Sequence, residues 1–206
     1  DAGTDEERIE WLLEVVSIYK DKIKSDTKVN NTYQAILDID PGHSESIDSL
    51  VQQYEAMKRW PDLVKILQTK IEHTNDDDDL IGLHRRVATI MMERFSNSAE
   101  AMKSYTAILA LEPEDAEAIE ALKAIYLTRR DFESYLLLSR REVALLEEDD
   151  ERAERFVELA RFATENIRKP AAAIELWEDV LTIHEELPEA LEQLEGLYER
   201  EKDYPN

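Results

Sequence analysis

Histidines and runs of carboxylates are the side chains of this sequence that could hold a metal ion. The histidines are His43, His73, His84 and His184. A zinc site needs several ligands that one helix or loop can bring together, such as two histidines three or four residues apart. No two of these histidines have that spacing, and we interpret each as part of the framework. The sequence therefore predicts no metal site.

The acidic run NDDDDL at residues 75–80 invites a calcium interpretation. A calcium-binding helix-loop-helix needs a glycine at its sharp turn and a bidentate glutamate at its end, and this run has neither. Similar acidic stretches, TDEER and EDDER, occupy residues 4–8 and 148–152. Carboxylates before a helix oppose the positive end of its dipole by about 0.3–1 kcal/mol each. We therefore interpret the three runs as helix starts.

Residues that could carry out covalent chemistry are as sparse as metal ligands. The chain has no cysteine, which excludes disulfides and thiolate catalysis. Its 4 glycines form no phosphate-binding loop, and no serine lies in a nucleophile elbow or in a Ser-His-Asp arrangement. We expect no catalytic residue, no enzyme activity and no cofactor within this chain.

The formal net charge of -23 over 206 residues restricts the partners. Such a charge repels nucleic acids and anionic membranes, and it attracts basic partners in a salt-dependent way. No run of 18 apolar residues predicts a membrane span. The amino terminus, DAGTDEERIE, is unlike a signal peptide. The absence of cysteine and of a signal peptide favours the cytoplasm as an expectation and leaves the localisation open.

A stretch of 22 residues occurs three times at a spacing of 72 residues, at 33–54, 105–126 and 177–198. No gap is needed to align the copies. Aromatic residues and leucines recur at Tyr33, Tyr105 and Trp177, at Leu50, Leu122 and Leu194, and at Tyr54, Tyr126 and Tyr198. A fixed period of this kind is typical of stacked arrays, and recurring aromatic residues are typical of their core.

Apolar residues at helical spacing predict two helical hairpins in each 72-residue copy. In the middle copy we expect helices near residues 79–95, 98–111, 115–129 and 131–147. Asp79, Ser98 and Asp115 have short side chains that accept hydrogen bonds from the free N–H groups at a helix start.

Each hairpin resembles a tetratricopeptide repeat, a helix-turn-helix of about 34 residues. In that family, alanine or another small residue lies in the first helix with an aromatic residue three positions later, and alanine lies in the second helix with a proline after it. The matching residues here are Ala88, Ala101, Tyr105, Ile108 and Pro113, and then Ala160, Ala173 and Trp177. The alternate hairpins depart from the pattern, with Lys70, Lys123, Glu142 and Glu195 at sites that are usually small.

The resemblance implies an all-α fold, a right-handed α-solenoid of about 11 helices in stacked antiparallel hairpins. The 72-residue double repeat then occurs in nearly three copies. We expect one array over residues 1–206, with a partial unit at 1–32, units at 33–104 and 105–176, and a partial unit at 177–206. Without distinct polar caps, the chain reads as a fragment of a longer array. We expect a monomer whose exposed terminal repeats could associate end to end.

The resemblance also implies a function without catalysis: a scaffold that binds a protein or peptide segment, in particular a basic one, in its concave groove. Arg85 and Arg86 are the candidate ligand-binding residues, because their counterparts in the other copies are not basic and first helices line the groove in this family. Their alternative role is pairing with neighbouring acids. Two other functions stay open: a structural spacer in a multiprotein assembly, and a regulatory module of an enzyme outside this chain.

Overall fold

The fold is all-helical. The computed structural model describes residues 3–203, and the side chains up to residue 200. Within this part of the chain there are eleven α-helices and one π-helical turn. The chain divides into two compact units, residues 1–111 and 112–206, and each is described here by itself. No helix in the described part is both long enough and apolar enough to cross a membrane.

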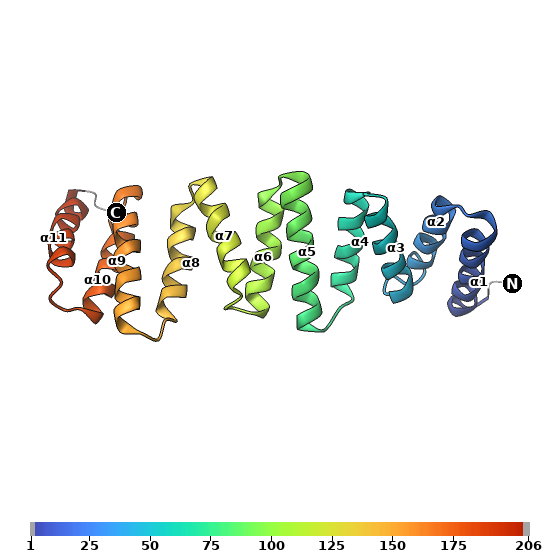
Figure 1. Ribbon diagram of the computed structural model, residues 1–206, viewed down its shortest axis with the longest axis horizontal. Helices are drawn as coiled ribbons and strands as arrows, with labels where there is room; N and C mark the ends of the chain where they lie inside the picture. The colour runs from blue at the N-terminus through green and yellow to red at the C-terminus, as the bar shows by residue number, and fades with distance from the viewer. Residues whose placement is uncertain (1–2, 204–206) are drawn as a thin grey trace. The chain divides into compact units, whose positions relative to one another are not determined.

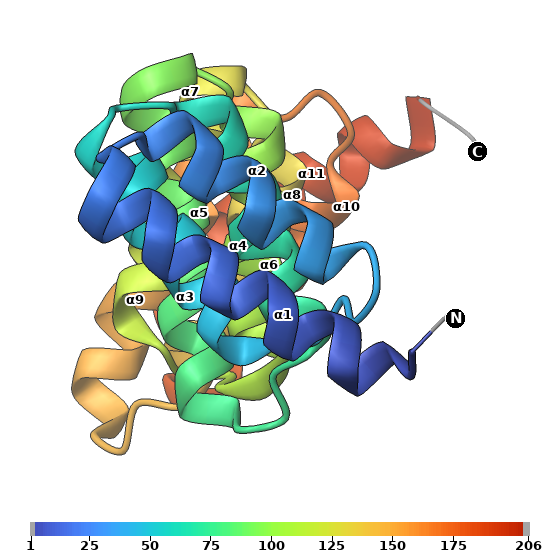
Figure 2. The ribbon, with the colours of Figure 1, turned by 90° about the vertical axis from the view of Figure 1, so that its right-hand side faces the viewer.

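Unit 1 consists of six α-helices, and each packs against the next in sequence (Figure 1). Figure 2, turned by 90°, brings α1 toward the viewer with α2 beside it. The elements are α1 (Asp5–Ile18), the π-helical turn η1 (Tyr19–Ile23), α2 (Asp26–Leu37), α3 (Ser44–Ala56), α4 (Trp60–Glu72), α5 (Asp77–Phe95) and α6 (Ser98–Leu111). The core is a continuous apolar cluster in which Ile36, Leu50, Leu63 and Leu67 are fully buried.

Unit 2 has the same sequential packing in five helices. They are α7 (Ala116–Arg129), α8 (Phe132–Ala144), α9 (Asp149–Asn166), α10 (Ala171–Ile183) and α11 (Pro188–Asp203). Trp177 of α10 is fully buried, and its Nε1–H donates a hydrogen bond of 3.1 Å to Thr164 Oγ1 of α9. Arg140 connects α8 to α10 because its Nε and Nη2 both donate to the carboxylate of Asp179, at 2.6 and 3.0 Å.

The helices expected in the middle copy are confirmed, with corrections at their ends. The second of them runs over the expected residues, and the fourth ends at Ala144 rather than at residue 147. Asp115 caps α7 as predicted, accepting from the Ala118 N–H at 2.7 Å. The prediction of Asp79 as the cap of α5 is wrong: Asp76 accepts from the Asp79 N–H at 3.0 Å.

The acidic runs do lie at helix starts, as the sequence predicts. Asp77, Asp78 and Asp79 form the first turn of α5.

For α6, the side chain of Asn97 caps the helix by accepting from the Glu100 N–H at 3.2 Å, so the cap lies one residue before the predicted Ser98. The capping residue precedes the helix because its side chain accepts from the N–H groups two or three positions further on.

The positions that match between repeat copies lie mostly in the core. The small residues Ala88, Ala101, Ala160 and Ala173 are buried, as close helix crossings require. Tyr33, Tyr105 and Trp177 are buried too, whereas Tyr198 is 40% exposed. The prediction of a single array over residues 1–206 stays a prediction.

Several helices end without the glycine that usually turns the chain there. Non-glycine residues adopt the left-handed backbone conformation at Lys24, Lys58, Ser96 and Arg130, with φ between 50° and 58°. Glycine takes this conformation without steric conflict, whereas other residues are strained in it. The chain has only 4 glycines, and none of the glycines in the described part has a positive φ.

Two neighbouring leucines of α8 test how unit 2 is packed. Leu136 is 4% exposed and Leu137 is 75% exposed. We predict that Leu136→Ala lowers the free energy of unfolding by about 2–5 kcal/mol, because it removes buried methyl groups and leaves a cavity. Leu137→Ala, the matched control, changes it by about 0.5 kcal/mol or less. Denaturant unfolding of both variants measures the effect, and equal losses would contradict this packing.

His84 of α5 makes the stability of unit 1 depend on pH. Burial lowers the pKa of His84, beside Glu72, Glu100 and Lys103 in a cavity between α4, α5 and α6. The folded state therefore favours the neutral ring. The stabilisation is complete above the unfolded pKa of about 6.5 and is lost as the pH falls through the lower folded value.

We predict that His84→Leu, which installs the leucine found at the matching position 12, makes unfolding less dependent on pH than in the original chain. The measurement is denaturant unfolding of both proteins at about pH 8 and about pH 5. Because the other titrating groups are shared, the difference between the two proteins isolates His84. An identical loss of stability on acidification in both proteins would contradict the prediction.

Candidate ligand-binding cavity of unit 2

Three consecutive helices, α7, α8 and α9, enclose a cavity of about 380 Å³ in unit 2. We call it the unit 2 cavity. Its charged lining residues are Glu120, Lys123, Glu142, Glu151, Arg155 and Glu158. In the hairpin order, α7 and α9 are first helices and α8 is the second helix between them. Two first helices therefore line the cavity, and the resemblance to tetratricopeptide repeats implies that first helices line the groove.

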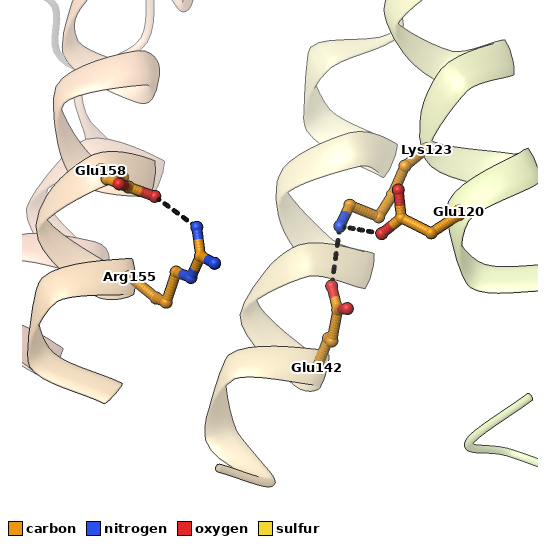
Figure 3. Close-up of polar contacts among 5 residues, drawn as sticks. All are labelled: Glu120, Lys123, Glu142, Arg155 and Glu158. Carbon is orange, nitrogen blue, oxygen red and sulfur yellow. Dashed lines mark hydrogen bonds and ion pairs between the residues drawn. The ribbon is translucent and has the colours of Figure 1, made fainter. Parts of the chain in front are cut away.

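Lys123 of α7 lies between two carboxylates (Figure 3). Its Nζ is 2.7 Å from Glu120 Oε1 on the same helix and 2.8 Å from Glu142 Oε2 on α8. Burial by itself would lower the pKa of Lys123, but the hydrogen bonds and charges of the two glutamates outweigh it and raise the pKa above its ordinary value. The ammonium group therefore stays charged across the physiological range.

A second ion pair faces the cavity from α9. Arg155 Nη1 is 3.0 Å from Glu158 Oε2, one helical turn away, and Figure 3 shows the guanidinium pointing toward α8. The hydrogen bond to Glu158 raises the pKa of Arg155. More than half of each side chain is exposed, so this pair adds little to stability. Its arginine can move at small cost if a ligand approaches.

The buried wall of the cavity holds a hydroxyl group without a partner. Ser139 of α8 is 2% exposed, and its buried Oγ has no hydrogen-bond partner in the described structure. A buried hydroxyl without a partner destabilises a fold by about 1–3 kcal/mol. Such a group therefore calls for an explanation, which a bound ligand would provide.

The repeat supplies an internal reference for the cavity. Ser139 corresponds to Leu67 and Arg155 to Leu83, and both leucines lie in the core cluster of unit 1. Two apolar side chains that fill the interface between α4 and α5 are thus replaced by a small hydroxyl and a long cation between α8 and α9. The replacement accounts for the open volume in unit 2.

The charges also change between the copies. Glu142 corresponds to Lys70, and Glu158 corresponds to Arg86. Two cations of unit 1 are therefore two carboxylates in unit 2, and four carboxylates line the cavity against two cations. The lining supplies fixed charge and a hydroxyl, which is chemistry suited to holding a cation. The other two carboxylates, Glu120 and Glu151, correspond to Asp48 and Asp79, so the cavity has an excess of negative charge where the matching positions of unit 1 are balanced.

The predicted ligand-binding residues Arg85 and Arg86 lie in unit 1 and are not among the residues that line this cavity. Arg86 Nη2 is 2.7 Å from Glu55 Oε2 and so connects α5 to α3, which is the acid pairing considered as the alternative role. Arg85 is half-buried on the same helix. A ligand-binding role for either residue stays a prediction.

The residues that build the cavity were visible in the sequence only as departures from a pattern. Lys123 and Glu142 occupy sites that are usually small, and they contact each other across one hairpin. That pairing of opposite charges is the signal that could have located the site. Ser139 carried no signal, because a serine among helical residues is unremarkable until its matching leucine is known to be buried.

The histidines belong to separate elements. His43 precedes α3 and its Nδ1 accepts from the Ser46 N–H at 3.3 Å, whereas His73 follows α4 and His184 follows α10. Across the described part of the chain, no group of three or more histidine, aspartate or glutamate side chains is arranged to hold a metal ion.

No protein-family model and no curated protein matches this chain. Among solved structures, it is similar to a tetratricopeptide repeat protein from Parabacteroides merdae, with 13% identity, 93% of this chain and 73% of that chain covered, and a TM-score of 0.42. It is also similar to MamA protein, with 14% identity, 98% of this chain and 97% of that chain covered, and a TM-score of 0.40. A third similar structure is PilW, a widely conserved type IV pilus biogenesis factor, with 15% identity, 95% of this chain and 91% of that chain covered, and a TM-score of 0.35.

Identities of this size and TM-scores below 0.5 transfer neither a function nor a partner to this chain. The architecture rests on the chain's own features instead. Its helices pack sequentially in antiparallel hairpins, and small residues are buried at the matching positions of successive copies. These features make the chain an all-helical repeat protein whose hairpins resemble tetratricopeptide repeats.

Proposed function

We propose that this protein is a non-catalytic scaffold that binds a basic segment of a protein partner on the first-helix face of unit 2. The observation that carries the proposal is the unit 2 cavity, which is open and has an excess of carboxylates where the matching positions in unit 1 include buried leucines and are balanced in charge. Repeat arrays bind partners along surfaces of this kind. The net charge of -23 would also speed the approach of a basic partner.

Affinity in such a site comes from charge complementarity and from desolvation. The carboxylates are held by helices rather than by loops, so little order is lost when a ligand binds. Exposed ion pairs are screened by salt, so binding should weaken as the ionic strength rises. A basic segment is thus favoured over an acidic or a neutral one of the same length.

We predict that peptides selected from a random 12-residue display library on the original chain are enriched in arginine and lysine. Binding of the selected peptides should be lost in the variant Glu142→Lys with Glu158→Arg, which installs the unit 1 residues at both positions. Fluorescence anisotropy at low and high salt measures the affinity. We expect a loss of about 100-fold, since each reversed contact with a charged group contributes about 1.5–3 kcal/mol.

The matched control is Glu133→Lys with Glu154→Lys. It makes the same kind of charge change on the same two helices, at exposed positions outside the cavity lining. Selected peptides that bind both double variants as they bind the original chain, or whose binding ignores salt, would rule out the proposed function.

A second candidate, a spacer in a multiprotein assembly, is favoured by a different observation. Leu137 of α8 is 75% exposed and Leu145, just after α8, is 53% exposed. Exposed leucines of this kind mark contact surfaces when they lie together. In that case partner binding would be lost in Leu137→Ser and would be insensitive to the charge reversal in the cavity.

A further inference from the structure

Ser139, whose hydroxyl is buried without a hydrogen-bond partner, lines the same cavity as the excess of carboxylates. A hydroxyl oxygen accepts hydrogen bonds, and carboxylates accept from charged donors. A ligand that satisfies both must therefore be a cation with several N–H donors. It must also be small enough for one cavity of about 380 Å³, near the lower end of ligand sites, about 300–1,000 Å³.

Lys123 shows what kind of group the carboxylates hold. Its ammonium group already contacts Glu142, yet Lys123 reaches only one oxygen of that carboxylate, Oε2. Glu151 lines the cavity as well and adds a further negative charge. A second cation can therefore be accommodated without leaving the lining positively charged.

The rest of the lining suits a long side chain with an apolar stem. Val143 and Leu159 are buried, and Tyr135 presents a half-buried ring from α8. Tyr135 is held by Phe162 of α9, with ring centroids 5.0 Å apart. An arginine stem packs on apolar walls of this kind, and a guanidinium stacks on aromatic faces.

We infer that the unit 2 cavity binds the side chain of an arginine from a partner protein, with its guanidinium donating to Glu142 and to Ser139 Oγ. The arginine takes the place of Lys123 on Glu142, and Lys123 keeps its contact with Glu120. Lysine is the poorer ligand, because its compact ammonium repeats the contact of Lys123 and lacks the planar fork that can serve two acceptors. The inference rests on the proposed function and names the residue that is recognised.

The test uses the full chain and three blocked tripeptides. The probe is acetyl-Ala-Arg-Ala-amide, and the comparisons replace arginine by lysine and by citrulline, which has nearly the same shape without the charge. Binding is followed by two-dimensional ¹⁵N NMR. The arginine peptide should shift the amide signals of Ser139 and Glu142 to saturation, the lysine peptide should bind more weakly, and citrulline should leave these signals unchanged.

Variants of the cavity should change this binding in opposite directions. Glu142→Gln should lower the affinity for the arginine peptide by about tenfold or more, because it removes a charge-assisted hydrogen bond. Lys123→Gln should raise the affinity for the arginine peptide by about two- to fivefold, because the substitution frees Glu142 and removes a like charge. Ser139→Leu, which installs the matching residue of unit 1, should abolish it by filling the cavity.

Glu133→Gln, an exposed carboxylate of α8 outside the lining, is the control and should bind like the original chain. Unfolding midpoints of all variants are measured in parallel. If Ser139→Leu does not fold, Glu142→Gln and Lys123→Gln decide the question, since a merely structural disturbance would not strengthen binding.

The inference is wrong if citrulline binds as tightly as arginine, if Lys123→Gln weakens the arginine peptide, or if the shifted signals lie outside α7, α8 and α9. Its failure is distinct from that of the proposed function. If the arginine peptide does not bind while the selected basic peptides still depend on Glu142 and Glu158, the scaffold function stands and arginine recognition in the cavity falls. If neither binds, both fall.

Discussion

Each helix of this chain can bury its apolar stripe only against the helices next to it in sequence. The core of each unit is therefore a series of interfaces, and every interface must be nearly complete in itself. Ile36, Leu50 and Leu63 show the usual solution, in which successive helices bury large aliphatic residues completely. A hollow in one interface is not compensated by a distant part of the molecule, so an interface that contains one calls for a local explanation.

The interface between α8 and α9 combines an open cavity with strong contacts around it. Arg140 binds the carboxylate of Asp179 through two nitrogens, and Trp177 is hydrogen-bonded to Thr164. These contacts join α8 and α9 to α10 through residues that do not line the cavity. The hairpins can therefore keep their arrangement although Ser139 fills less space than its counterpart. Local stability and an open cavity coexist because different side chains supply them.

Much of the fold could be predicted from the sequence, because a 72-residue period repeats the same evidence several times. Helix α6 begins and ends where the apolar spacing indicates, and Asp115 caps α7. The cap of α5 was misplaced because NDDDDL offers several equivalent aspartates, and only the backbone geometry selects Asp76. The repeat does not indicate which of several adjacent aspartates caps the helix.

The candidate site was less accessible to prediction than the fold. Arg86 stood out by its charge, yet it pairs with Glu55 of a helix that the sequence alone does not place beside it. The cavity depends on which positions face each other between α8 and α9. The difference between Leu67 and Ser139 acquires a meaning only when Leu67 is known to be packed in the core and the buried hydroxyl of Ser139 is known to have no hydrogen-bond partner.

The left-handed residues at the helix ends have a consequence for how this protein could evolve. Lys24, Lys58, Ser96 and Arg130 hold a backbone conformation that glycine adopts more easily, so each end retains a small reserve of stability that one substitution could release. None of these residues lines the unit 2 cavity. Stability at the turns and the lining of the cavity could therefore change through separate substitutions, without one constraining the other.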